Sequence, residues 1–247
     1  MPGDHANADG RFPTTRWSAI AGARSADGAE RERSWSALVR AYWKPAYKHL
    51  RVRWRASPED AEDAIQGFFE RAMQKDFFAA YDPGRARFRT FFRVCLERFV
   101  SNEVKARARL KRGGAAAAWP LEFAAAEEEI ARAGVAAWES PEDCFEREWR
   151  RGVFALAVEA LRAHCELKGK GSCFAAFQRY DLCEPAERPT YDALAADLGV
   201  AATTVTNHLA YARRELRRLV LEMLAEITAS EAELSSESRF VFGEEGG

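Results

Sequence analysis

Apolar residues recur every three or four positions along most of this 247-residue chain, which is the spacing of amphipathic α-helices. β-Branched residues are sparse, and no Asn-Gly or Asp-Gly pair stands between two runs of alternating polar and apolar residues. Such a pair is the strongest short-range mark of a β-hairpin. We therefore expect an all-α protein.

The composition suits a soluble protein with a hydrophobic core. Apolar residues make up 47% of the chain and charged residues 30%, enough for one or two folded domains. No apolar run approaches the roughly 18–20 residues of a membrane span. Residues 1–13 lack the basic and apolar segments of a signal peptide. We expect a cytoplasmic protein with no membrane contact.

Little in the chain indicates chemistry of its own. The five cysteines are an odd set without a Cys-x-x-Cys pair, which makes a disulfide framework or a zinc site a poor interpretation. Neither a cluster of histidines nor a phosphate-cradling glycine loop is present. We expect no catalytic residue, no metal ion and no cofactor.

Composition shifts divide the chain. A helical block ends near Arg112, and the stretch after it opens with paired glycines, is rich in alanine and contains a proline. A second helical block begins at Ser140, and the chain ends in an acidic, glycine-terminated stretch. The predicted layout is a helical domain at 1–112, an alanine-rich linker at 113–139, a second helical domain at 140–227 and an acidic tail at 228–247.

The stretch YDALAADLGVAATTVTNHLAYARREL, residues 191–216, reads as two amphipathic helices hinged at a glycine. Thr190 suits a helix cap, Gly199 suits a left-handed helix end, and a second helix is expected to start at Thr203 or Thr204. The expected buried positions are Tyr191, Leu194, Ala195, Leu198, Val205, Leu209, Ala212, Leu216 and Leu219. This is the helix-turn-helix pattern.

The other faces of the second helix suit duplex DNA. Polar residues at its start match base edges in a major groove, and the arginines further along match flanking phosphates. Four arginines fall between 213 and 218, opposed only by Glu215. That density favours DNA binding over an ordinary helical hairpin with a solvated surface. The predicted DNA-binding residues here are Thr203, Thr204, Thr206, Asn207, Tyr211, Arg213, Arg214 and Arg217.

A helix expected from Glu59 to about Gln74 carries an acidic stripe opposite its apolar face. Residues 57–82 hold seven acidic and two basic residues, a balance that repels DNA. The helix dipole explains acids in the first turn but not Asp63 or Glu70. A basic protein partner is therefore the hypothesis, with a solvated helix surface as the alternative. The stripe consists of Glu59, Glu62, Asp63, Gln66 and Glu70.

The next helix reverses the charge. Residues 84–112 hold ten basic and two acidic residues, with four phenylalanines interleaved at its start. Basic residues beside aromatic ones suit single-stranded or melting nucleic acid, although most of these phenylalanines form an apolar stripe typical of a core. The predicted DNA-binding residues are Arg93, Arg98, Asn102, Lys105 and Arg109.

The order and spacing of four segments resemble the bacterial RNA polymerase sigma factors, specifically the small two-domain type called extracytoplasmic function or ECF-like. The segments are FPTTRWSAI, SPEDAEDAIQGFFERAMQ, FRTFFRVCLERFVSNEVKARARLKRGG and YDALAADLGVAATTVTNHLAYARRELRRLV. The resemblance implies that Glu62, Asp63 and Gln66 dock on the clamp helices of core RNA polymerase. It further implies that the basic helix lies at the promoter's minus-ten element and that the helix-turn-helix reads the minus-thirty-five element.

The resemblance also sets the expected partners, which are core RNA polymerase and promoter DNA. An anti-sigma factor or another regulator stays open as a further partner. A sigma factor performs no chemistry itself, so we do not expect an enzyme. The alternative function is a free-standing helix-turn-helix transcriptional regulator. An enzyme acting on phosphodiesters through a carboxylate-bound metal is disfavoured, because the acids lie on one solvated stripe.

Overall fold

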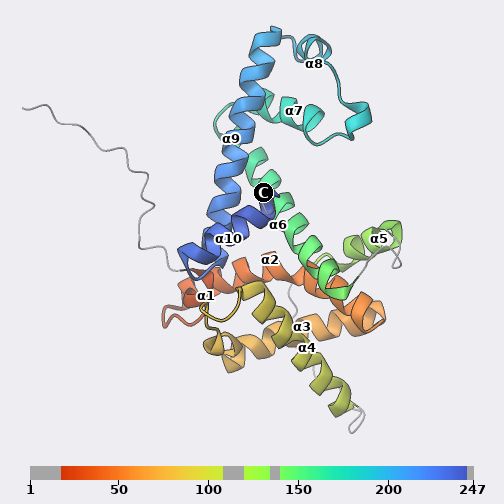
Figure 1. Ribbon diagram of the computed structural model, residues 1–247, viewed down its shortest axis with the longest axis vertical. Coiled ribbons are helices and arrows are strands. Elements are labelled where there is room, and N and C mark those ends of the chain that lie inside the picture. Colours follow the sequence, from red (N-terminus) through yellow and green to blue (C-terminus); the bar gives the residue numbers. More distant parts are fainter. Residues whose placement is uncertain (1–17, 108–119, 134–139, 244–247) are drawn as a thin grey trace, which may run out of the picture.

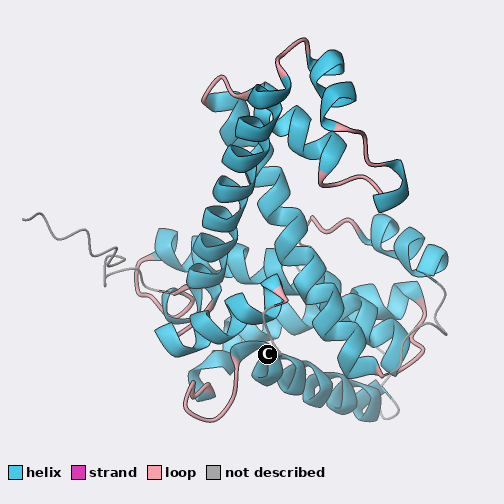
Figure 2. Ribbon diagram, turned by 45° about the horizontal axis from the view of Figure 1, so that its top comes forward, coloured by secondary structure: helices cyan, strands magenta, loops and turns pink. Residues whose placement is uncertain are grey.

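The computed structural model describes residues 18–107, 120–133 and 140–243, and every regular element in these ranges is helical (Figures 1 and 2). The expected all-α class is confirmed. In the same ranges, no helix combines the length and the apolar character that a membrane crossing demands. The elements are α1 (Ala19–Gly22), α2 (Gly28–Arg53), α3 (Pro58–Lys75), η1 (Phe77–Ala80), α4 (Phe88–Arg107), α5 (Phe123–Ala133), α6 (Pro141–Leu167), α7 (Gly171–Tyr180), η3 (Pro185–Glu187), α8 (Tyr191–Leu198), α9 (Ala202–Ile227) and α10 (Glu231–Phe242).

The repeated tetrapeptide Ser-Pro-Glu-Asp starts two of the long helices in the same way. The Ser57 hydroxyl accepts a hydrogen bond from the Asp60 amide at 3.1 Å, and Ser140 accepts one from the Asp143 amide at 3.0 Å. In both helices proline occupies the first turn, where its missing amide hydrogen costs nothing. The segment is a helix-start device, as its sequence predicts.

Helices from both sides of the alanine-rich stretch share one core. α2 packs along α6, and α9 rises beside α6 toward α7 and α8 (Figure 1). Tyr42 of α2 stacks on Phe92 of α4 with ring centroids 4.6 Å apart, and Trp149 of α6 lies 6.2 Å from the same tyrosine ring. All three side chains are buried. The division into two domains stays a prediction, because helices of both predicted domains contribute to this common core.

Part of the predicted linker is docked on α2. Phe123 of α5 packs against Trp43 and Tyr47, with ring centroids 5.4 Å and 5.0 Å apart. The Glu127 carboxylate accepts hydrogen bonds from Tyr47 at 2.7 Å and from Arg51 Nε at 2.6 Å. Residues 123–133 are therefore held by apolar and charged contacts together.

Part of the predicted acidic tail is also packed. α10 buries two glutamates, and Glu233 accepts hydrogen bonds from the Tyr81 hydroxyl at 2.9 Å and from the Phe88 amide at 2.5 Å. Glu237 lies 2.8 Å from the guanidinium of Arg89. Two acids of this tail thus face the start of α4 rather than solvent.

Candidate nucleic-acid interface

The hinge between α8 and α9 forms as expected, apart from where α9 begins. Thr190 caps α8, and Gly199 ends it at φ 65°, a left-handed conformation that favours glycine. α9 starts at Ala202, earlier than the expected Thr203 or Thr204. The amides of Thr204 and Val205 donate to the Ala201 carbonyl, so the first turn closes one residue sooner.

The two helices pack through small and branched residues. Leu194 and Ala195 of α8 form a small core with Val205 and Leu209 of α9, and Ala176 of α7 completes it. Ala212 and Leu216 are buried further along α9, as expected. The remaining predicted core positions are half-buried, namely Tyr191, Leu198 and Leu219.

This packing leaves most of the predicted DNA-binding residues of α9 in solvent. Thr203, Asn207 and Arg214 are exposed and fall at helical positions i, i+4 and i+11, on one line opposite the buried residues. Thr206, Arg213 and Arg217 are also exposed, while Thr204 and Tyr211 are half-buried. The structure therefore presents a polar and basic face along the first half of α9, with exposed Ala210 between Asn207 and Arg214.

The four arginines of α9 differ in their surroundings. Arg213 makes two hydrogen bonds to Asp181, at 2.9 Å and 2.8 Å, which tie α9 to the end of α7. Arg218 donates to Glu215 and Glu222 at 2.8 Å and 2.7 Å. The guanidinium of Arg217 lies 4.4 Å from the centre of the Phe242 ring.

Arg214 is more open than Arg213 and Arg218. Its side chain is 69% exposed and lies 3.9 Å from Glu215. The i, i+4 spacing of Arg218 and Glu222 allows their pairing to be predicted from the sequence. The pairing of Arg213 with Asp181, 32 positions away, cannot be predicted in this way. Arg214 is accordingly the arginine of this face best placed to meet a phosphate.

The acidic stripe of α3 is assembled on one side of a helix whose other side is core. Ala61, Ile65, Phe68, Phe69 and Ala72 are fully buried, as the periodicity predicts. Opposite them, Glu59 and Asp63 are exposed, and Glu62, Gln66 and Glu70 are half-buried. Glu70 accepts a hydrogen bond from Gln74 at 3.2 Å. All five predicted polymerase-binding residues therefore share one surface.

The predicted DNA-binding residues of α4 separate into two groups. Arg93 is only 18% exposed, and its guanidinium lies 2.9 Å from Glu97 and 3.0 Å from Glu142 of α6. Arg98 and Asn102 are exposed. Lys105 lies in the last turn of α4, with its side chain outside the described residues, as is all of Arg109. Arg93 thus holds α4 against α6, while Arg98 and Asn102 are accessible.

The phenylalanines of α4 belong mainly to the core. Phe88 and Phe92 are fully buried and Phe99 nearly so, whereas Phe91 is half-buried. The apolar-stripe interpretation is confirmed for the first three. In Figure 1 the far end of α4 and the start of α9 lie at opposite ends of the long axis, so the two predicted nucleic-acid surfaces are well separated.

Two basic residues that the sequence analysis did not single out lie beside α9. Lys168 and Lys170 stand in the loop between α6 and α7, and Lys170 Nζ lies 4.3 Å from the centre of the Tyr211 ring. The motif Lys-Gly-Lys-Gly was the available signal. Its proximity to α9 depends on how α6 and α7 pack.

Nothing in the described ranges points to a metal centre or a reactive thiol. No group of three or more histidine, cysteine, aspartate or glutamate residues there could hold a metal ion. Burial raises the pKa of the thiols of Cys95, Cys144, Cys165 and Cys173, so they stay protonated near neutral pH.

The chain matches no protein-family model, no curated protein and no solved structure.

Proposed function

We propose that this protein is a sigma factor that binds core RNA polymerase and directs it to promoters. The observation that carries the proposal is the exposed line of Thr203, Asn207 and Arg214 on a helix set against α8 by a left-handed glycine. A helix pair with this turn is the helix-turn-helix arrangement, whose second helix enters the major groove. The separate acidic face of α3 supports a second, protein partner.

Each surface has a distinct role in this proposal. The start of α9 offers hydroxyl and amide groups to base edges, and Arg214 offers a cation to the flanking phosphate. Arg98 and Asn102, near the far end of α4, would meet the DNA strand that opens at the start site. Melting then requires no chemistry on this chain, because tighter binding of the open strand than of the duplex shifts the equilibrium toward opening.

The alternative is a free-standing helix-turn-helix regulator. The shared core of α2, α4 and α6 is the observation that favours it, because a sigma factor must place two surfaces on two separate promoter elements. The two functions differ in whether the acidic face of α3 has a partner.

Co-elution with core RNA polymerase tests the proposal. We expect the wild-type chain to form a stoichiometric complex on size exclusion and the Glu62→Lys/Asp63→Lys variant to form none, because reversed charges repel a basic docking surface. The matched control is Glu159→Lys/Glu166→Lys, which reverses two exposed acids of α6. That variant should still co-elute. Absence of any wild-type complex would leave the free-standing regulator in its place.

Two substitutions in α9 separate phosphate contacts from base contacts. Arg214→Ala should weaken binding to every duplex and reduce the slope of log K against log salt by about 0.9. Asn207→Ala should instead change the preference at one base pair by about 1–3 kcal/mol. Fluorescence anisotropy at several salt concentrations measures the first effect, and selection from a random duplex library measures the second.

Arg218→Ala is the control for Arg214→Ala. It removes the same charge from the same helix, but Arg218 already donates to two glutamates, so a smaller change in the salt slope is expected. If Asn207→Ala and Arg214→Ala both changed the affinity equally for all DNA sequences, the assignment of this face of α9 to a DNA groove would be wrong.

A further inference from the structure

The loop between α6 and α7 carries two lysines on a closed backbone turn. The Lys170 amide donates to the Cys165 carbonyl at 2.7 Å, and the Gly169 amide donates to the Glu166 carbonyl at 3.1 Å. Gly169 has φ 64°, the left-handed conformation in which this kind of turn ends a helix. The turn therefore fixes the backbone positions of Lys168 and Lys170, while their side chains are exposed.

Tyr211 connects this loop to the exposed face of α9. Its ring has Lys170 Nζ at 4.3 Å from the centroid and the Arg214 guanidinium at 5.5 Å. Its hydroxyl lies 3.1 Å from Nε2 of His164, a contact that fixes the ring against α6. A cation from the loop and a cation from α9 thus share one aromatic side chain, so the two elements form one basic surface.

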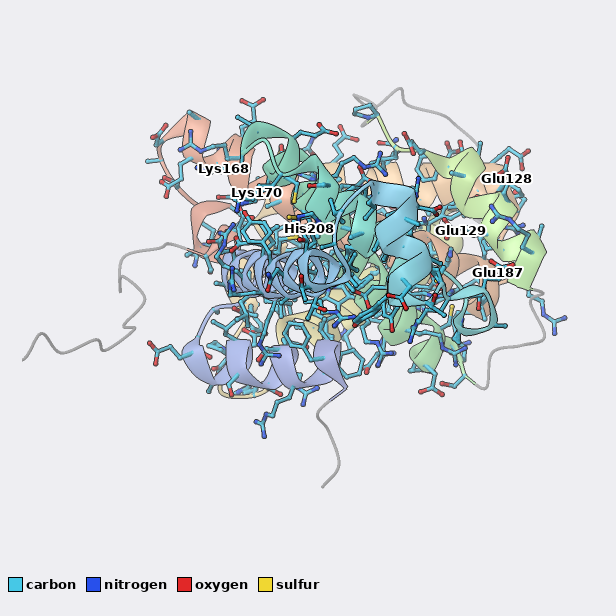
Figure 3. All side chains as sticks on the ribbon, turned by 90° about the horizontal axis from the view of Figure 1, so that it is seen from above. Glu128, Glu129, Lys168, Lys170, Glu187 and His208 are labelled. Carbon is cyan, nitrogen blue, oxygen red and sulfur yellow. The ribbon has the colours of Figure 1, made fainter. Side chains whose placement is uncertain are left out.

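The two flanks of α9 carry different charge. On the flank facing α8, Arg213 is neutralised by its two hydrogen bonds to Asp181. On the Tyr211 flank, neither Lys168 nor Lys170 forms an ion pair within the described part of the chain. In the view from above in Figure 3, Lys168 and Lys170 lie on one side of His208 of α9, and Glu128, Glu129 and Glu187 lie on the other. On the α8 flank Arg188 also stacks on Tyr180 without an ion pair among the described residues. Residues 179–197 nevertheless hold five acidic and two basic residues, so the balance of charge is negative on that flank and more positive beside Tyr211.

We propose that Lys168 and Lys170 form a second phosphate-binding element, which contacts the backbone of duplex DNA beside the groove entered by α9. The inference rests on the proposed DNA binding of α9 and adds a contact from outside the helix pair. A helix in a major groove lies between two phosphate backbones, so cations next to its edge meet one of them. The charge asymmetry assigns that backbone to the Tyr211 flank.

Salt-dependent binding tests this element, because each lysine that neutralises a phosphate releases counterions. The probe is a fluorescein-labelled duplex of mixed sequence, titrated with the full chain at several sodium chloride concentrations. For Lys168→Gln/Lys170→Gln we expect the slope of log K against log salt to fall by about 1.8, at about 0.9 per phosphate. At low salt the dissociation constant should rise about tenfold or more.

Two comparison variants make the result specific. Arg33→Gln/Arg40→Gln removes the same net charge from exposed positions of α2 and should keep the wild-type slope. Lys168→Arg/Lys170→Arg should keep it as well, since the cations remain. An equal loss of slope in the α2 variant would overturn the proposal, because net charge alone would then account for the effect.

The outcomes also separate this inference from the proposed function. If the wild-type chain binds duplex and Arg214→Ala lowers the slope, but the lysine double variant matches the wild type, only the role of the α6–α7 loop is overturned. If the wild-type chain does not bind duplex DNA, the DNA-binding function of α9 falls and this inference falls with it.

Discussion

Lys48→Met will lower the free energy of unfolding by about 3–5 kcal/mol, because it leaves a carboxylate buried without its main cation. Lys48 is 1% exposed in the centre of α2. Its Nζ lies 2.5 Å from Glu148 of α6 and 2.7 Å from Glu129 of α5. After the substitution, Glu148 keeps the exposed Arg151 at 3.1 Å, while Glu129 keeps Lys44 at 2.5 Å. Chemical denaturation monitored by circular dichroism measures the loss.

The double variant Lys48→Met/Glu148→Met is the matched control. Replacing both buried charges by apolar side chains of similar volume removes the desolvation cost together with the attraction, so it should recover most of the loss. Lys75→Met, at an exposed position, should change the free energy of unfolding by no more than about 0.5 kcal/mol. A loss of less than about 1 kcal/mol for Lys48→Met would mean that the buried charges are not coupled as the distances indicate.

Glu237 will contribute about 2–3 kcal/mol of stability at about pH 5 that is lost by about pH 8. Burial raises the pKa of Glu237 to about 7, and this effect outweighs the opposing attraction of Arg89 and Arg87. Arg89 lies 2.8 Å away but also approaches Glu146 at 3.5 Å and stacks on Phe240. The nearby acids Glu233 and Glu146 raise the pKa further.

The sign follows from the pKa in each state. In the unfolded chain the pKa of the Glu237 carboxyl is about 4.3, so the folded state binds the proton more tightly. The stabilising contribution is complete below the unfolded pKa and is lost as pH rises through the folded pKa of about 7.

Glu237→Gln isolates this contribution, since its amide does not titrate. The free energy of unfolding of the wild type minus that of the variant should decrease steadily from acid to weakly alkaline pH. Buried His49 is present in both proteins, so its lowered pKa cancels in the difference. A difference independent of pH would show that Glu237 stays ionised throughout and that its contact with Arg89 overcomes the burial.

Local features of the helices were predictable from the chain itself. The caps at Ser57, Ser140 and Thr190 and the left-handed end at Gly199 form as their residue types predict. The fully buried stripe of α3 follows its periodicity as well. These features depend on residues within one or two turns of one another, where helical geometry alone sets the neighbours.

The surroundings of individual charges were not predictable in the same way. Periodicity places Arg93, Arg98 and Asn102 away from the apolar face of α4, but it does not indicate which of them faces another helix. Arg93 meets Glu142, which lies 49 positions away in the chain, and Arg213 meets Asp181, 32 positions away. Such pairs exist only because α4, α6, α7 and α9 pack in one particular arrangement.

The acidic segments show the same limit. Composition predicted only a linker at 113–139 and an acidic tail at 228–247, yet Glu233 and Glu237 are buried and Glu127 and Glu129 bind α2. The sequence by itself determined the helical class, the helix ends and the apolar faces, since these arise from short-range geometry. Only the tertiary structure decided which charges are paired, buried or free, because a charge's environment is set by helices distant in the chain.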